Sequence, residues 1–166
     1  QIDGADINTQ NCQVLLNAVE ENNLEKTEAA LELGANPNMR SGDAIINRAK
    51  NVDMIKLLVK HHSELTGVVF ENISNDLEAV IFCLNQGLDP NFGNYLPYRR
   101  CCRGSYISES KPGESYFQVL MMLIKYGAII SDPKAGDSFV RWAAEFGRSD
   151  IINYLASKGV KNGYKK

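Results

Sequence analysis

The sequence predicts an all-α protein built from about five repeated helical hairpins. A short glycine-containing phrase recurs along the 166 residues, with 25 to 40 residues between successive copies. An acidic residue or a glutamine stands nine positions before each later copy, and an apolar stretch lies between the two marks. Periods of this length are typical of repeat proteins, in which each unit buries its apolar face against the next one.

The recurring phrase marks the end of a helix in each repeat. It reads G-A-D-I-N from position 4, G-A-N-P-N from position 34 and G-L-D-P-N from position 87. A weaker copy starts at Gly127, Gly159 opens a last one, and His62 takes the same place in between without a glycine. Glycine just past a helix end accepts the left-handed conformation that closes the helix. We therefore expect a helix to end before each later copy, and the chain to begin inside a hairpin.

The second mark predicts where each of those helices begins. An acidic side chain in the first turn of a helix is stabilised by the helix dipole. The marks are Glu25, Asp53, Glu78, Gln118 and Asp150, and they open apolar stretches at 29–31, 55–59, 79–82, 119–124 and 151–155. Two independent marks agree at five positions, which predicts five copies of one helix.

A shorter helix is expected upstream of each of these five. Its clearest copy spans 138–147 and contains the paired small residues Ala143 and Ala144, which let two helices approach closely. In the fourth repeat, Cys101 and Cys102 occupy those two positions, and repeats two and three are a few residues short here. The chain is then a single domain, with repeats at about 9–38, 39–66, 67–91, 92–131 and 132–166 and an insertion near 104–114.

The stretch S-F-V-R-W-A-A-E-F-G at 138–147, followed by S-D-I-I, resembles the ankyrin pattern T-P-L-H-x-A-A-x-x-G-x-x-E-I-V-x-x-L-L-x-x-G-A-D. The resemblance covers nearly the whole chain in degenerate copies, although no repeat carries a full T-P-L-H. The ankyrin family implies a helical-hairpin solenoid with hairpin or turn fingers, which binds other proteins through its fingers and first helices. A different helical-hairpin array, such as an armadillo-like one, is the alternative fold.

The resemblance also implies where a partner would dock. Fingers are expected near 38–41, 92–95 and 132–135, and the two positions after the paired small residues are expected to face outward. The insertion is rich in glycine, serine and proline, which is typical of a loop, and it is flanked by arginines and tyrosines, which are enriched at binding hot spots. A solvated loop without a partner is the other reading of the insertion. The partner-binding candidates are Met39, Arg40, Phe92, Asn94, Tyr95, Arg99, Arg103, Tyr106, Lys134, Glu145 and Phe146.

These features predict a protein–protein interaction module, a scaffold or adaptor, that works as a monomer and is not an enzyme. The sequence contains no phosphate-binding loop and no hydrolase or metalloprotease motif, so we expect no catalytic site, metal or cofactor. Adjacent His61 and His62 would point about 100° apart on a helix, which disfavours a shared metal ion, and they suit the negative end of a helix dipole. Cys101 and Cys102 are interpreted as core residues, with a reactive thiol beside the neighbouring arginines as the alternative. The degenerate repeats and the many asparagines suit a host-directed factor of microbial or viral origin.

Charge is divided unevenly along the chain. Residues 1–91 carry 14 acidic and 6 basic side chains, a net of −8, whereas residues 92–166 carry 6 acidic and 12 basic, a net of +6. The basic half gives an alternative function, the binding of nucleic acid or another polyanion, although the acidic half would repel phosphates. Hydrophobic residues make up 44%, no apolar run could span a bilayer, and no signal-peptide pattern is present. The sequence therefore predicts an intracellular protein, cytoplasmic or nuclear, without a membrane segment.

Overall fold

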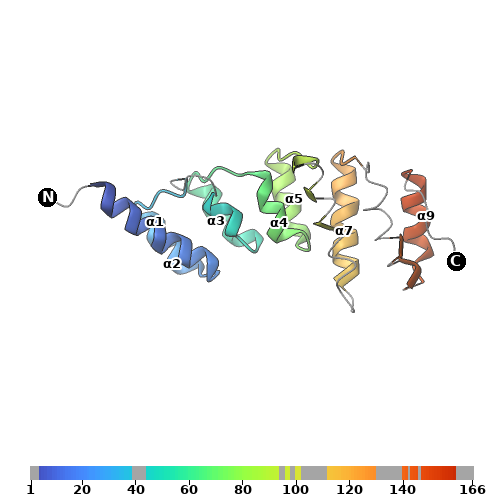
Figure 1. Ribbon diagram of the computed structural model, residues 1–166, viewed down its shortest axis with the longest axis horizontal. Coiled ribbons are helices and arrows are strands. Elements are labelled where there is room, and N and C mark those ends of the chain that lie inside the picture. The colour runs from blue at the N-terminus through green and yellow to red at the C-terminus, as the bar shows by residue number, and fades with distance from the viewer. Residues whose placement is uncertain are drawn as a thin grey trace. The chain divides into compact units, whose positions relative to one another are not determined.

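The chain is helical wherever the structure defines a regular element. The computed structural model describes residues 4–38, 44–93, 96–97, 100–101, 112–129, 140–141, 143–145 and 147–159, and no strand occurs in these ranges. The predicted all-α class is confirmed. The elements in Figure 1 are α1 (Gly4–Glu20), α2 (Leu24–Glu32), η1 (Ile45–Arg48), α3 (Val52–Lys60), η2 (Gly67–Val69), α4 (Phe70–Ile73), α5 (Leu77–Asn85), α7 (Pro112–Lys125) and α9 (Ser149–Ser157).

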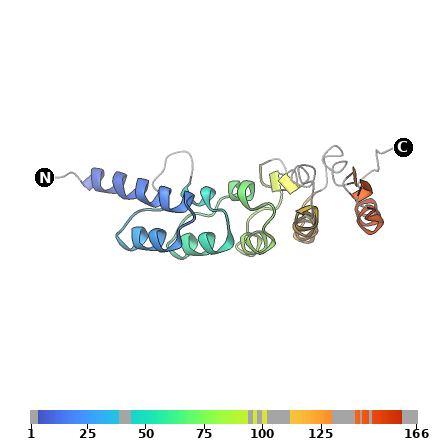
Figure 2. The same cartoon turned by 90° about the horizontal axis from the view of Figure 1, so that it is seen from below.

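The chain divides into two compact units, Gln1–Ile73 and Ser74–Lys166. In the first unit the elements form two rows. One row contains α1, η1, η2 and α4, because α1 packs against η1 and η1 packs against both η2 and α4. The other row contains α2, which packs against α1, and α3, which packs against α2. Figure 2 shows α2 and α3 side by side beneath α1 and η1. The helical segments expected to be short are short: η1 has four residues, and η2, with three, runs directly into α4, with four.

The core of the first unit is built from side chains of both rows. Full burial of one large apolar side chain stabilises the fold by about 1.5–3 kcal/mol. Asn47, 7% exposed, is also part of this core. Its Oδ1 accepts a hydrogen bond from Thr66 Oγ1 at 2.7 Å, and its carbonyl accepts one from Asn72 Nδ2. The largest fully buried side chains in this unit are Leu15, Ile45, Ile46, Met54, Ile55, Leu58, Phe70 and Ile73.

The second unit is built around α7. Helix α5 packs against α7, and Leu120 and Leu123 of α7 are fully buried. The rings of Phe117 on α7 and Tyr154 on α9 meet edge to face with centroids 6.2 Å apart, a favourable aromatic geometry that connects these two helices. The inner face of α9 is buried through Ile151 and other apolar side chains.

Four of the five expected helix starts are confirmed, because Glu25, Asp53, Glu78 and Asp150 lie in the first turns of α2, α3, α5 and α9. The fifth is wrong. Gln118 lies in the middle of α7, which begins at Pro112. Proline is well accommodated in a first helical turn, where its missing N–H would have no partner, so the helix extends into the segment expected to be a loop near 104–114.

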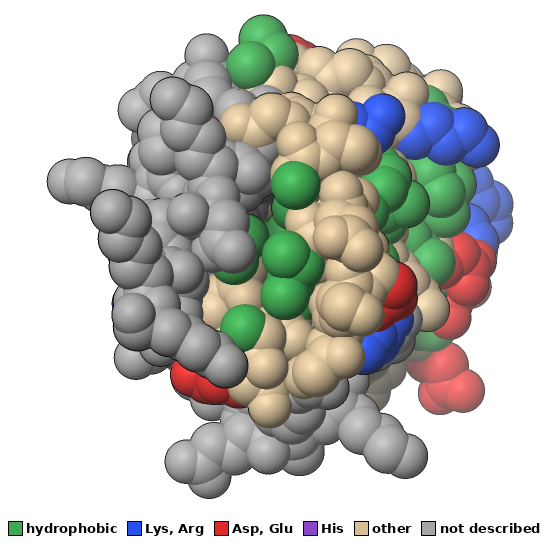
Figure 3. Space-filling view, turned by 90° about the vertical axis from the view of Figure 1, so that its right-hand side faces the viewer, with side chains coloured by type: hydrophobic (Ala, Val, Ile, Leu, Met, Phe, Trp, Pro, Cys, Tyr) green, Lys and Arg blue, Asp and Glu red, His purple; other side chains and the backbone are tan. Residues whose placement is uncertain are grey.

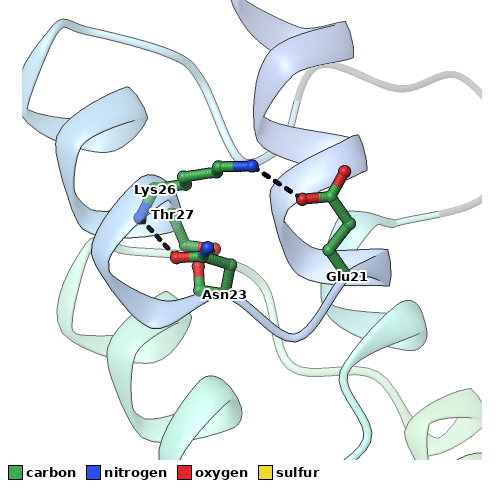
Figure 4. Close-up of polar contacts among 4 residues, drawn as sticks. All are labelled: Glu21, Asn23, Lys26 and Thr27. Atoms are coloured by element: carbon green, nitrogen blue, oxygen red, sulfur yellow. Dashed lines mark hydrogen bonds and ion pairs between the residues drawn. The ribbon is translucent and has the colours of Figure 1, made fainter.

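Three of these helices also have side-chain caps at their N-termini, which the sequence analysis did not predict. Asn23, Asn51 and Asp76 each stand just before a helix, and each side chain accepts a hydrogen bond from the backbone N–H three residues on, at 2.9–3.0 Å. Figure 4 shows the Asn23 cap at the start of α2. Such a cap contributes about 1 kcal/mol to stability. Each lies eleven residues before the closing position, by which we mean the left-handed residue just past the helix.

All five expected closing positions are confirmed. Backbone N–H groups at and after these positions bond back to the last turn, which is the hydrogen-bonding pattern of a left-handed helix end. His62 adopts this conformation although it is not a glycine, as its spacing predicts. The φ angles are +89° at Gly34, +65° at His62, +90° at Gly87, +94° at Gly127 and +87° at Gly159.

The copy of the phrase that starts at Gly4 does not mark a helix end. Residues 4–8 lie within α1, which runs without a break from Gly4 to Glu20. The phrase instead forms the start of this helix. The expectation that the chain begins inside a hairpin concerns residues 1–3, which lie outside the described residues.

Candidate partner-binding surface

Asn38 connects the segment after α2 to the end of α3. Its Nδ2 donates to the carbonyl of His62 and its Oδ1 accepts from the N–H of Glu64, both at 2.8 Å. The Oδ1 of Asn36 accepts from the N–H of Asn38 at 2.9 Å, which is a side-chain-stabilised turn that presents Asn38 to its partners. An amide side chain carries an NH₂ group that donates and an oxygen that accepts, so it satisfies a carbonyl and an N–H two residues apart.

Asn91 makes the same contact in the second unit. Its Nδ2 donates to the carbonyl of Gly127 at 3.1 Å, and its Oδ1 accepts from the N–H of Ile129 at 2.7 Å. The turn before it is also the same, because Asp89 Oδ1 accepts from the N–H of Asn91 at 2.8 Å. In both units the last asparagine of one phrase binds the closing position of the next phrase and the residue two positions further on. We call this the asparagine contact.

The phrase between these two copies lacks the asparagine contact. Thr66 stands where Asn38 and Asn91 stand, and its hydroxyl donates instead to Asn47 of the same unit. Ser63 in this phrase takes the place of Ala35. Both are buried, at 7% and 5% exposure, but the Ser63 hydroxyl has no hydrogen-bond partner among the described residues. The middle repeat is therefore degenerate in its polar contacts as well as in its sequence.

Three large apolar side chains are exposed around the Asn91 contact. Phe92 directly follows Asn91 and is 36% exposed, and Ile129, whose N–H Asn91 binds, is 54% exposed. Tyr126 precedes the closing glycine, is 38% exposed, and donates its hydroxyl to Asn85 Oδ1 at the end of α5 at 2.5 Å. We call Phe92, Tyr126 and Ile129 the apolar cluster. Phe92 was expected at a finger tip; it lies in a helical turn beside the asparagine contact.

The ends of the first helices carry charged side chains. Glu20, Glu21 and Glu145 are all exposed, as expected for outward-facing positions. Glu21 forms an ion pair of 3.0 Å with Lys26 at the start of α2 (Figure 4). The carbonyl of Glu20 accepts a hydrogen bond from Lys50 Nζ at 2.6 Å. These contacts tie the turn after α1 to the elements around it.

The paired small residues are only partly as expected. Ala143 is buried, whereas Ala144 is exposed, so one of the two lies at the helix contact. Cys101 is fully buried, as expected, and its Sγ lies 3.6 Å from the carbonyl oxygen of Ser74. Cys102 lies outside the described residues.

The structure describes two of the eleven sequence-predicted binding residues. Phe92 and Glu145 are described, and both are exposed. The candidates outside the described residues are Met39, Arg40, Asn94, Tyr95, Arg99, Arg103, Tyr106, Lys134 and Phe146.

The remaining chemistry-bearing groups have structural roles. Burial, with a smaller contribution from the charge of Asp76, raises the pKa of the Cys83 thiol to about 12, so this thiol stays protonated and unreactive. His61 is the C-cap residue that directly follows α3, and its N–H bonds back to carbonyls of the last turn of that helix. Within the described ranges, no group of three or more metal-ligating side chains comes together.

Two cations near α9 already have partners. The Arg148 guanidinium binds the Asp150 carboxylate through two bonds of 2.9 and 3.0 Å, and the hydrogen bond from this side chain lowers the pKa of Asp150. Lys158 Nζ lies 5.6 Å from the ring centroid of Tyr154, within cation–π range.

Helix α9 is polar on its outer side, where Ser149, Asp150 and Asn153 are exposed. Figure 3, which faces the α9 end, shows apolar side chains in small groups separated by uncharged polar atoms and backbone. None of the helices in the described part of the chain is both long enough and apolar enough to cross a membrane.

Comparison with known proteins adds no relative to this picture. The chain matches no protein-family model and no curated protein.

Proposed function

We propose that this chain is a protein-binding module made of ankyrin-type repeats. The observation that carries the proposal is the asparagine contact, made by Asn38 and again by Asn91 with the same two backbone positions of the following phrase. It gives the recurring phrase one structural role in both units. Together with the resemblance of 138–147 to the ankyrin pattern, it supports a stack of hairpins whose fingers are held by backbone contacts.

Binding through the fingers is supported by what the asparagine contact leaves exposed. The side chains beside it are not needed to hold the turn, since the contact uses only the amide of Asn91 and the backbone of residues 127 and 129. Phe92 and Ile129 are free to meet a partner, and large apolar side chains that gather on a surface mark interaction sites. We propose that the partner is a protein, docked on the fingers and on outward positions such as Glu145.

The test is affinity capture with the immobilised full chain from a lysate of its source or host, followed by identification of the bound proteins. We expect a partner whose recovery falls when Phe92→Ser and Glu145→Lys are combined. Val14→Ser is the matched control, because Val14 is 56% exposed on α1 and is not among the proposed binding residues. Capture of the same proteins in equal amounts by all three chains would contradict the proposed surface.

The same experiment addresses the alternative function. Nucleic acid retained at low salt and released steeply as salt rises would favour a polyanion-binding role instead. Circular dichroism of each variant establishes that a lost partner is not a lost fold.

A further inference from the structure

The boundary between the two compact units lies inside a repeat and not between two repeats. The third repeat expected from the sequence spans 67–91, and it contains η2, α4 and α5. The first unit ends at Ile73 and the second begins at Ser74, so α4 belongs to one unit and α5 to the other. A turn of three residues, 74–76, connects the two helices. The hydrogen bonds on each side of this turn explain the division.

Asn47 holds η2 and α4 to the first unit. This core residue is 7% exposed. Thr66, which directly precedes η2, donates its hydroxyl to Asn47 Oδ1 at 2.7 Å. Asn72 on α4 donates its Nδ2 to the Asn47 carbonyl. Loss of one partner leaves the other buried group unsatisfied, so these bonds favour α4 staying with the first unit when the chain opens.

Helix α5 is held to the second unit near both of its ends. Just before its start, the carbonyl of Ser74 lies 3.6 Å from the Sγ of the buried Cys101. At its end, the Oδ1 of Asn85 accepts the hydroxyl of Tyr126, which directly follows α7. Beyond its end, the asparagine contact of Asn91 binds the backbone that follows α7. All of these partners belong to the second unit.

The last phrase before the boundary is the one at position 62, and it ends in Thr66. The asparagine contact needs an amide that donates and accepts at two backbone positions, which a threonine hydroxyl does not provide. In the phrases at 34 and 87, that contact connects each phrase to the next one inside the same unit. The contact is thus present within each unit, and position 66, just before the boundary, has lost it.

We propose that the chain opens at the turn 74–76, with α4 unfolding and refolding together with the first unit and α5 together with the second. Elements that share buried contacts open together, and different groups of elements open with different free energies. Two helices that are neighbours in the sequence therefore report on different units. This device lets one unit open while the other stays folded. The proposal does not depend on the proposed function, because it concerns which helices are stable together and not what the chain binds.

Hydrogen exchange of the full chain, followed by NMR, tests where the chain divides. Asn38→Ala removes both bonds of the asparagine contact in the first unit. We expect it to accelerate amide exchange in α4 by about tenfold and to leave exchange in α5 unchanged. Asn91→Ala is expected to do the reverse. Equal acceleration of α4 and α5 in either variant would overturn the proposal, because the third repeat would then open as one piece.

Urea unfolding provides a probe of the second unit alone. Trp142 is the only tryptophan in the sequence, and it lies beyond the boundary. We expect Asn91→Ala to lower the urea midpoint of the Trp142 fluorescence by about 1 M and Asn38→Ala to leave it unchanged. A midpoint that falls as far in Asn38→Ala as in Asn91→Ala would also overturn the proposal, since the two units would then unfold as one.

Asn72→Ala tests the attachment of α4 directly. The Asn72 side chain is exposed, so its loss leaves the apolar core intact. We expect exchange in α4 to accelerate by about tenfold, with α5 unaffected. Asn75→Ala is the matched control, because Asn75 is exposed in the turn and makes no side-chain hydrogen bond to a described residue. Exchange in Asn72→Ala that equals that of the parent would show that Asn47 does not hold α4, and the proposal would fall.

Discussion

The asparagine contacts at Asn38 and Asn91 have the same geometry but differ in what they bind. In the second unit, Asn91 binds a closing glycine, and a small alanine, Ala128, follows that glycine. In the first unit, Asn38 binds the carbonyl of His62, a left-handed residue with a side chain. The next residue is Ser63, whose buried hydroxyl has no partner in the described part of the chain. The contact is thus preserved where the residues that it binds have changed.

This difference teaches that the asparagine contact recognises backbone, not side chains. A carbonyl and an N–H two residues apart are present whatever the sequence of the partner phrase, so the phrase can degenerate without loss of the contact. The cost of degeneration is local, because a left-handed residue with a Cβ and a buried hydroxyl without a partner both destabilise the fold. The first unit should therefore contain two sites that are easily improved, and the second unit none of this kind at the equivalent positions.

Removing the asparagine should have the largest effect, and a similar one in both units. Asn38→Ala and Asn91→Ala each delete two hydrogen bonds to backbone and are expected to lower the free energy of unfolding by about 1–3 kcal/mol. Urea unfolding followed by circular dichroism measures the loss. Asn153→Ala is the control, since Asn153 is exposed on α9. If Asn91→Ala costs much less than Asn38→Ala, the two contacts are not equivalent.

Ser63→Ala should stabilise the first unit by about 1 kcal/mol, because it removes a buried hydroxyl that no described residue bonds and leaves the alanine found at position 35. Thermal unfolding of the full chain reports the gain. Ser157→Ala is a suitable control, because that serine is exposed at the end of α9. A destabilised Ser63→Ala variant would mean that the hydroxyl is hydrogen-bonded in solution.

His62→Gly should stabilise the same unit by about 0.5–1 kcal/mol, the difference between the cost of a left-handed residue with a Cβ and the extra chain entropy of glycine. The reverse change, Gly127→Ala, should destabilise the second unit by about 1–2 kcal/mol, because φ is +94° there. Apart from its two chain neighbours, no described residue has an atom within 4 Å of the Cβ that alanine would add, so the loss measured by urea unfolding isolates the backbone effect. Equal stability of Gly127→Ala and the parent would contradict the left-handed assignment.

The smallest expected effect concerns the side chains that stand just before α3 and α9. Asn51 caps α3 with its side chain, whereas Arg148 before α9 makes no cap and instead binds Asp150. The pKa of Asp150 is lowered from 3.8, so any stability from this pair is present above the unfolded-state pKa and is lost as pH falls through the folded pKa. Arg148→Gln should raise the pKa of the Asp150 carboxyl toward 3.8 in an NMR titration. An unchanged titration would show that the guanidinium does not bind this carboxylate in solution.

The sequence predicted helix boundaries well where local chemistry decides them. Acidic residues in the first turn and residues at the closing position act through the backbone of their own helix, so their spacing alone located α2, α3, α5 and α9. His62 shows the strength of spacing, since no glycine is present there. Position 4 shows its limit, because the same phrase there forms the start of α1.

The contacts between repeats were beyond the sequence reading, although their signal was present. The sequence shows that an asparagine recurs at the end of the phrase. Its hydrogen bonds to the backbone of the following phrase, made by Asn38 and Asn91, depend on how the chain folds. The caps at Asn23, Asn51 and Asp76 had an equally regular spacing and could have been found. Which apolar side chains remain exposed, such as Leu33 and Ile129, depends on tertiary packing, which no local pattern specifies.

The asparagine contacts join residues only 24 to 38 positions apart in the chain. Loops of that length lose little entropy when they close, and a fold with such local contacts forms rapidly without waiting for distant segments to meet. Each hairpin can therefore fold soon after it leaves the ribosome, by packing against the hairpin that precedes it in the chain. Pulled from its ends, such a chain is expected to yield in small successive steps, one hairpin at a time.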